Sequence, residues 1–131
     1  MFKNLPRQQF GKLQAKLFPL YFSTASLCAA VLLGTATSMG SAVTTKVLAT
    51  LGMGLGSSLL NLIIVEPMTT DNMFERYQLE NSGKADAERR QKLKKQFGML
   101  HGISSTINLV NLVAVIAHCS WLGTLLHSAV L

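Results

Sequence analysis

The charged side chains of this 131-residue sequence are confined to a few segments. Every Asp, Glu, Lys and Arg lies in residues 1–16, at Lys46 or in residues 66–98, and the stretches between and after these segments carry none. A helix needs about 20 mostly apolar residues to cross the hydrocarbon of a bilayer, where a central charge costs roughly 2.5–3.5 kcal/mol. The segregation therefore predicts an all-α integral membrane protein built as a helical bundle.

Three uncharged stretches predict three membrane-spanning helices within a single domain, residues 1–131. We place the spans at about residues 17–37, 47–65 and 102–125, with a hydrophilic connection at residues 66–98. Only 14% of the residues are charged, whereas a typical soluble domain has roughly 25%. A soluble chain of this length has no means of burying three long apolar spans.

The N-terminal segment, residues 5–16, is expected to form an amphipathic helix. Phe10, Leu13 and Leu17 follow the spacing of one helical face, and the basic side chains around them would reach lipid phosphates. A solvated helix end is the alternative interpretation. Pro19 is expected in the first turn of the first span, where its missing N–H costs nothing.

The hydrophilic connection is expected to contain two helices. Pro67 is expected to end the second span, and residues 69–71 are candidate N-caps of a helix that breaks at the Asn-Ser-Gly sequence 81–83. A further helix is expected to start near Lys84 and to run into the third span. Residues 84–96 are strongly basic and are candidates for binding anionic lipid headgroups.

The distribution of Lys and Arg predicts an orientation. Eleven of the twelve lie in residues 1–16 and 66–98, and only Lys46 lies on the opposite side. The positive-inside rule therefore places residues 1–16 and 66–98 in the cytoplasm and the C-terminus in the lumen or outside the cell. Because the net charge of +6 is explained by this topology, we do not expect nucleic acid to be a partner.

Polar residues inside the spans form a candidate functional face. On the third span they recur at helical spacing, and one Asn of the second span is a plausible partner for them. They would serve either as hydrogen bonds between helices or as the lining of a path for a small solute or ion. The residues of this face are Asn61, Ser104, Asn108, Asn111 and His118.

Small residues in the first two spans are candidates for close helix packing. They recur every four residues, which is the spacing that lets two helix backbones approach each other in a membrane. The partner helix would come from this chain, from a second copy in a homo-oligomer or from another membrane protein. The residues are Ser26, Ala30, Gly34, Gly52 and Gly56.

No residue pattern points to catalysis, to a metal or to a cofactor. The sequence contains no nucleophile–base motif and no phosphate-binding loop. Cys28 and Cys119 have no metal-site or redox spacing, and His118 beside Cys119 makes a poor ligand pair because neighbours on a helix point about 100° apart. We therefore expect no enzymatic activity.

Three sequence strings together resemble a known family. They are LPRQQFGKLQAKLFPLYF, NLIIVEPMTTDNMFE and FGMLHGISSTINLVN, at residues 5–22, 61–75 and 97–111. Their order and spacing are similar to those of the transmembrane protein 205 family, over residues 2–125. That family has four membrane helices, so the resemblance implies that this chain corresponds to the last three. It implies a multi-pass membrane protein and no established reaction.

The resemblance singles out Glu66 and His101. They match the Glu of the family's Glu-Pro-x-Thr-Thr segment and the His of its His-Gly-x-Ser-Ser segment, and both fall at the predicted cytoplasmic membrane edge. Ionisable groups near lipid are costly without partners. A hydrogen bond between the two would pin two spans together, and it would also suit a proton relay or a ligand-binding pair. Alternatively, each side chain faces the headgroups.

Overall fold

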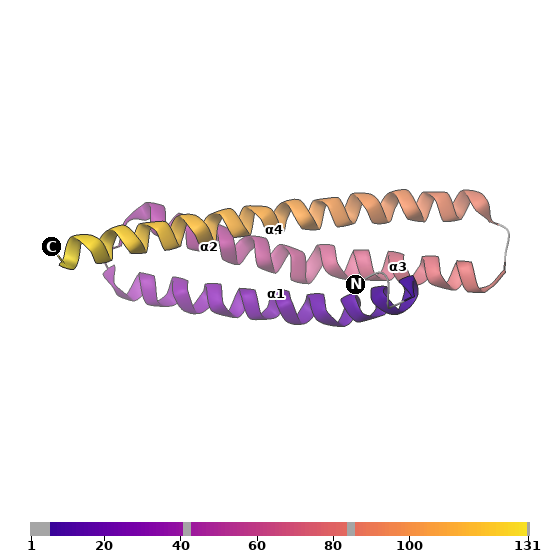
Figure 1. Ribbon diagram of the computed structural model, residues 1–131, viewed down its shortest axis with the longest axis horizontal. Coiled ribbons are helices and arrows are strands. Elements are labelled where there is room, and N and C mark those ends of the chain that lie inside the picture. Colours follow the sequence, from indigo (N-terminus) through magenta and orange to yellow (C-terminus); the bar gives the residue numbers. More distant parts are fainter. Residues whose placement is uncertain (1–5, 41–42, 84–85, 131) are drawn as a thin grey trace.

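The chain forms three long helical rods (Figure 1). The computed structural model describes residues 6–40, 43–83 and 86–130, so the expected helix start at Lys84 lies outside the described residues. Helices α2, η2 and α3 follow one another without a break and make one rod. The elements are α1 (Arg7–Ser38), α2 (Thr45–Leu60), the π-helical turn η2 (Asn61–Val65), α3 (Glu66–Asn81) and α4 (Ala87–Val130).

The three rods are long and apolar enough to cross a membrane. In the apolar 18-residue stretch that qualifies each rod as a membrane span, few residues are buried within the chain. The buried share is 11% in α1, 11% in α4 and 28% in the middle rod. Large side chains such as Leu20 and Leu27, both 65% exposed, therefore cover the outside. An apolar surface of this extent requires lipid around it. The predicted all-α membrane helical bundle is confirmed, and it supports an integral membrane localisation.

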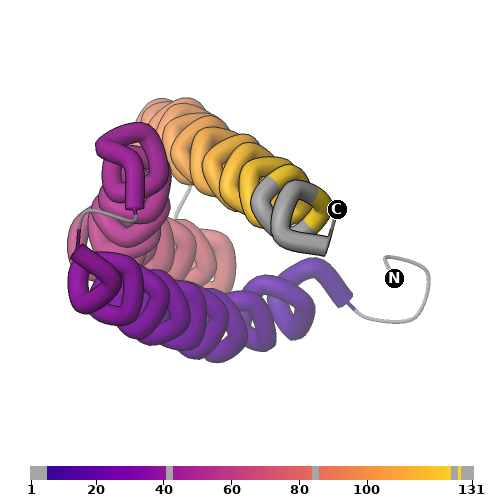
Figure 2. The backbone as a smooth tube through the Cα atoms, turned by 90° about the vertical axis from the view of Figure 1, so that its left-hand side faces the viewer, coloured from indigo at the N-terminus to yellow at the C-terminus, as the bar shows by residue number. Residues whose placement is uncertain are grey.

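Helices α1 and α4 both pack on the middle rod. Helix α1 runs along one side of α2–η2–α3 and α4 along another, in up–down–up order (Figure 1). Seen end-on, the C-terminal part of α4 turns away from α1 (Figure 2). The end of α1, the start of α2 and the C-terminal part of α4 lie at one end of the bundle, and the end of α3 and the start of α4 lie at the other (Figure 1).

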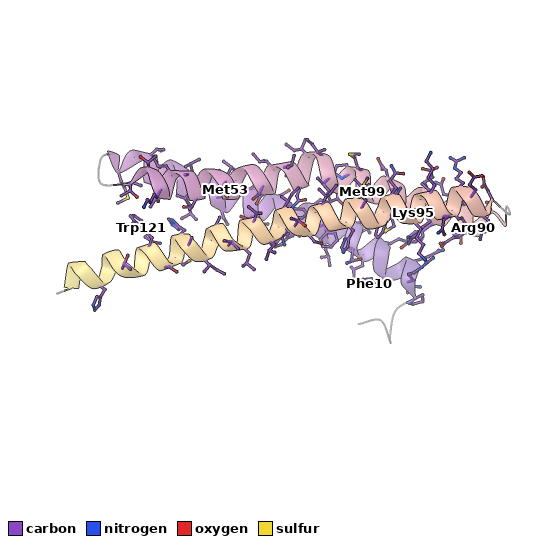
Figure 3. The ribbon with its side chains drawn as sticks, turned by 90° about the horizontal axis from the view of Figure 1, so that it is seen from above. Phe10, Met53, Arg90, Lys95, Met99 and Trp121 are labelled. Atoms are coloured by element: carbon purple, nitrogen blue, oxygen red, sulfur yellow. The ribbon has the colours of Figure 1, made fainter. Side chains whose placement is uncertain are left out.

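A small apolar cluster closes the end near the α1–α2 turn. Trp121 extends from α4 toward the middle rod (Figure 3) and packs against this cluster. Burying the indole there holds the splayed part of α4 to the other two rods. The buried members of the cluster are Ala36, Val43, Val47 and Leu51.

Residues 7–16 are helical, as expected, but they do not form a short helix of their own. The described part of residues 5–16 is continuous with the first span, and Pro19 lies well inside α1 instead of in its first turn. Pro19 has no N–H to donate to the Ala15 carbonyl, a loss that a membrane helix tolerates when neighbouring groups compensate. The helix continues because its first turns are held by α3.

Gly11 allows this docking of α1 on α3. A Cβ atom at Gly11 would lie 2.1 Å from Tyr77 Oη and 2.7 Å from Met73 Sδ. The Tyr77 hydroxyl donates to the Arg7 carbonyl at 3.4 Å. Any side chain at this position would force the ends of the Tyr77 and Met73 side chains to move, so glycine favours the close approach. The basic segment thus packs on α3 and does not lie free on the membrane surface.

The chain does not break at Pro67, where the second span is expected to end. The chain passes through this point by way of η2, in which the Glu66 N–H donates to the Asn61 carbonyl, five residues back. A π-helical turn shifts the hydrogen-bond register, and Pro67 then lies at the start of α3, where a missing N–H is tolerated. Thr69 donates to the Val65 carbonyl at 2.6 Å and is therefore no N-cap. The break predicted at residues 81–83 is present, because α3 ends at Asn81.

Candidate functional site

Glu66 and His101 line the same cavity without a hydrogen bond between them among the described contacts. Glu66 is buried, and its Oε1 accepts a 2.7 Å hydrogen bond from Thr70 one turn further along α3. His101 is exposed and stacks on Phe97, with ring centroids 5.9 Å apart. Each residue of the predicted pair is therefore held by a neighbour on its own helix.

The polar face joins α4 to the middle rod. Asn61, only 1% exposed, donates through Nδ2 to the Ser104 carbonyl at 3.3 Å. Asn111 donates to Ser58 Oγ at 3.2 Å. The expected partnership of Asn61 with the Asn residues of the third span is thus corrected, since its partner is a backbone carbonyl. Gly54 leaves room for Asn111, because a Cβ atom at Gly54 would lie 3.2 Å from Asn111 Oδ1.

Asn108 connects α4 to α1 instead. Its Oδ1 accepts a 3.2 Å hydrogen bond from the Tyr21 hydroxyl. Tyr21 and Asn108 border two cavities that lie between α1 and α4. The bond therefore crosses the groove between these two helices and divides it.

One of these two cavities, here called the interior chamber, has a volume of about 510 Å³. Apolar and small side chains of α1, α2 and α4 form most of its wall, to which Asn111 and His118 add polar groups. His118 Nδ1 is buried without a hydrogen-bond partner among the described residues. Cys28 and Cys119 are free thiols that line the same chamber from α1 and α4.

The second cavity, the boundary chamber, is smaller, at about 110 Å³. Glu66, His101 and Ser104 line it, and the Tyr21–Asn108 bond lies between it and the interior chamber. Phe18 and Thr70 link it to a third cavity of about 440 Å³ among the first turns of α1, α3 and the start of the third span. We call this third cavity the outer chamber. A row of chambers thus follows the groove along the bundle.

Most of the predicted packing residues do not pack within the chain. Ser26 is buried, but Ala30 is exposed, and so are the three glycines of the predicted set. A Cβ atom at Gly34, Gly52 or Gly56 would meet nothing within 4 Å. Close approach inside the chain uses Gly11 and Gly54 instead.

Charged residues meet at the outer end of the bundle. Arg7 of α1 and Arg76 of α3 share the carboxylate of Glu80, Arg7 by a hydrogen bond and Arg76 at 3.8 Å. Burial alone raises the pKa of Glu80, but the hydrogen bond and charge of Arg7, with Gln8 and Arg76, hold this pKa below its ordinary value of 4.5. On the exposed side, Glu75 raises the pKa of Arg89 by pairing with it.

The described side chains offer hydrogen bonding and charge. Within residues 6–40, 43–83 and 86–130, no three His, Cys, Asp or Glu side chains come together to hold a metal ion. The site offers polar groups that hydrogen-bond between helices and a cluster of cationic side chains at its outer end.

Several residues of this site are absent from the predicted set. Tyr21, Ser58, Gly11 and Arg76 each make a contact between helices. Met73 and Tyr77, spaced four apart in a hydrophilic segment, were a signal for an apolar face on α3 that another helix covers. The other contacts depend on which helices become neighbours, which no local pattern specifies.

Comparison with known proteins gives a family and no activity. Residues 1–78 match the family described as "Domain of unknown function (DUF4149)", a match that spans α1, α2, η2 and most of α3. Searches of curated proteins and of solved structures found no match. Since the matched residues make up more than half of the chain, the protein belongs to the DUF4149 family.

Proposed function

We propose that the chain is a multi-pass membrane protein with a structural or interaction role, and that it associates with further copies of itself. The observation that carries the proposal is the groove between α1 and α4, whose interior chamber contains the unpartnered His118 Nδ1. A buried polar atom without a partner is costly in a membrane. A transmembrane helix in the groove would cover the chamber and offer a hydrogen-bond donor.

A second copy suits the groove because its α2 exposes a face of small residues. Gly52 and Gly56 are exposed on α2, and so are Thr45 and Ala49, which precede them on the same helical face. Helices with small residues at this spacing approach other helices closely in membranes, and the Thr45 hydroxyl adds a donor to this face. The small residues of α2, which make no close helix contact within their own chain, would then pack into the α1–α4 groove of the second copy.

Energy transfer between labelled copies in lipid vesicles tests the proposal. Ala29 lines the interior chamber from α1, whereas Leu27 on the same helix faces outward. Ala29→Trp fills the groove and should reduce self-association at least tenfold, while Leu27→Trp should leave it unchanged. A wild-type chain that stays monomeric at all protein-to-lipid ratios would overturn the proposal, as would equal effects of the two variants.

A carrier for a small solute or ion is the second candidate. Asn108, Asn111 and His118 line the interior chamber, whereas the Asn61 side chain is enclosed between helices and bonded to Ser104. The native thiols of Cys28 and Cys119 report on the chamber directly. Labelling of both by a membrane-impermeant maleimide would favour a water-filled path, and protection would favour a chamber covered by a helix.

The orientation and the closer family relationship belong to the same proposal. The excess of Lys and Arg in residues 1–16 and 66–98 supports a cytoplasmic outer end. The three strings that resemble the transmembrane protein 205 family support a multi-pass membrane protein and imply no particular reaction. Protease protection of a C-terminal tag tests the orientation, and digestion of the tag from the cytosolic side would reverse it.

A further inference from the structure

We propose that the outer end of the bundle is a binding site for one anionic phospholipid. In this site the phosphate lies among Arg76, Arg90 and Lys94, and an acyl chain enters the outer chamber between α1, α3 and α4. The site is separate from the interior chamber, so the inference goes beyond the proposed self-association and does not depend on it.

The charge at this end is unbalanced. A polar hollow of about 320 Å³ lies against the outer chamber and is lined by Glu80 and by four cationic side chains, Arg7, Arg76, Arg90 and Lys94. Arg7 hydrogen-bonds to Glu80. Glu80 is the one carboxylate among the described residues that line the hollow, against four cations, and a phosphate group would supply the missing negative charge.

Arg76 joins the polar hollow to the outer chamber, because it lines both. Its side chain is only 12% exposed, and Nε is buried without a hydrogen-bond partner among the described residues. The guanidinium lies over the Phe97 ring at 5.0 Å. Arg76 is thereby fixed between the basic surface and the apolar one, with its Nε 3.8 Å from the Glu80 carboxylate.

The outer chamber fits a hydrocarbon chain. Its wall is predominantly apolar, with Met73 and Phe97 on opposite helices and Phe18 at the membrane end. The lining described for it includes no Asp or Glu. From the level of Arg7 to that of Phe18 it extends eleven residues along α1, or about 16 Å at the rise of an α-helix. A cationic end joined to an apolar slot of this length matches an anionic amphiphile.

Arg90 and Phe10 lie at the same end of the bundle (Figure 3), which is also the end that the charge bias assigns to the cytoplasm. Basic residues beside a membrane attract anionic lipid in general. The specific site differs from that general attraction, because it needs Arg76 in its fixed position and an open slot beneath it.

Native mass spectrometry of the detergent-purified protein, with dioleoyl phosphatidylglycerol or dioleoyl phosphatidylcholine added, tests the site. We expect one phosphatidylglycerol adduct at least tenfold more abundant than the phosphatidylcholine adduct. Arg76→Gln should reduce this adduct at least tenfold. Arg89→Gln, which removes the same charge from the same hydrophilic hairpin but outside the hollow, should leave it unchanged.

Two further variants keep the test decisive if Arg76→Gln fails to fold. Arg90 is exposed, so Arg90→Gln should fold normally and reduce the adduct several-fold. Ala15 lines the outer chamber, and Ala15→Trp should exclude the acyl chain, whereas Leu17→Trp on the exposed face should not. Equal binding of both lipids overturns the proposal. So does displacement of the adduct by millimolar inorganic phosphate, or an unchanged adduct in Arg90→Gln and Ala15→Trp.

Discussion

The Tyr21 hydroxyl donates a 3.2 Å hydrogen bond to Asn108 Oδ1 and so joins α1 to α4 across the groove that otherwise separates them. On one side of this bond lies the interior chamber with Cys28 and Cys119, and on the other side lies the boundary chamber with Glu66. The two helices pack chiefly on the middle rod, so this hydrogen bond is one of the few contacts between α1 and α4 among the described residues, and it lies where the two chambers meet.

Removing the Tyr21 hydroxyl should open the interior chamber toward the outer end. Tyr21→Phe keeps the ring but loses the bond, and we expect several-fold faster maleimide labelling of Cys28 and Cys119 in vesicles. Tyr77→Phe is the matched control, because it removes a hydroxyl that bonds to the Arg7 carbonyl at the outer chamber, away from the two chambers that the Tyr21–Asn108 bond separates. Equal labelling rates in both variants would show that the bond does not divide the groove.

Gly11 should be the glycine least tolerant of substitution. A Cβ at this position would overlap Tyr77 and Met73, so Gly11→Ala should lower the free energy of unfolding by about 1–3 kcal/mol through overpacking. Gly34→Ala, where a Cβ meets nothing within 4 Å and which lies outside the proposed α2 interface, should raise it by up to about 1 kcal/mol through helix propensity. Unfolding in mixed micelles measures both, and a harmless Gly11→Ala would contradict the docking of α1 on α3.

The lowered pKa of Glu80 makes the docking of α1 dependent on pH. An ionised Glu80 stabilises the folded state above its ordinary pKa of 4.5, and this contribution disappears as the pH falls through the lowered value. Its size should not exceed about 1 kcal/mol, because Arg7 is largely exposed. We expect Glu80→Gln and Arg7→Gln each to flatten the loss of stability below pH 4.5, measured by unfolding at a series of pH values. If the free energy of unfolding still fell with pH as steeply in both variants as in the wild type, the Arg7–Glu80 ion pair would not be the cause of the pH dependence.

Glu66 and His101 should act independently on stability. Glu66→Leu leaves the Thr70 hydroxyl without its acceptor at a buried position and should cost about 1–3 kcal/mol. His101→Ala, at an exposed position, should change stability by about 0.5 kcal/mol or less. A double-mutant cycle should show a coupling below about 0.5 kcal/mol. A larger coupling would restore the pinning pair that the sequence suggested.

Much of the candidate site was predictable from helical periodicity. The spacing of Asn108, Asn111 and His118 predicted a common face, and all three line the interior chamber. Their individual partners were not predictable, because Asn108 bonds to α1 and Asn111 to α2. A period specifies which way a side chain points from its own helix, and the neighbouring helix supplies the partner.

By itself the sequence determined the membrane and the helices, because a long uncharged stretch can satisfy its backbone in lipid only as a helix. Only the tertiary structure decided that α1 continues through Pro19 and that a π-helical turn carries the middle rod past Pro67. It also decided that Gly11, and not Gly52 or Gly56, brings two helices together. Local composition limits what each segment can form. Contacts between distant segments compensate for the N–H that a proline lacks, and they decide where a glycine lets two helices approach closely.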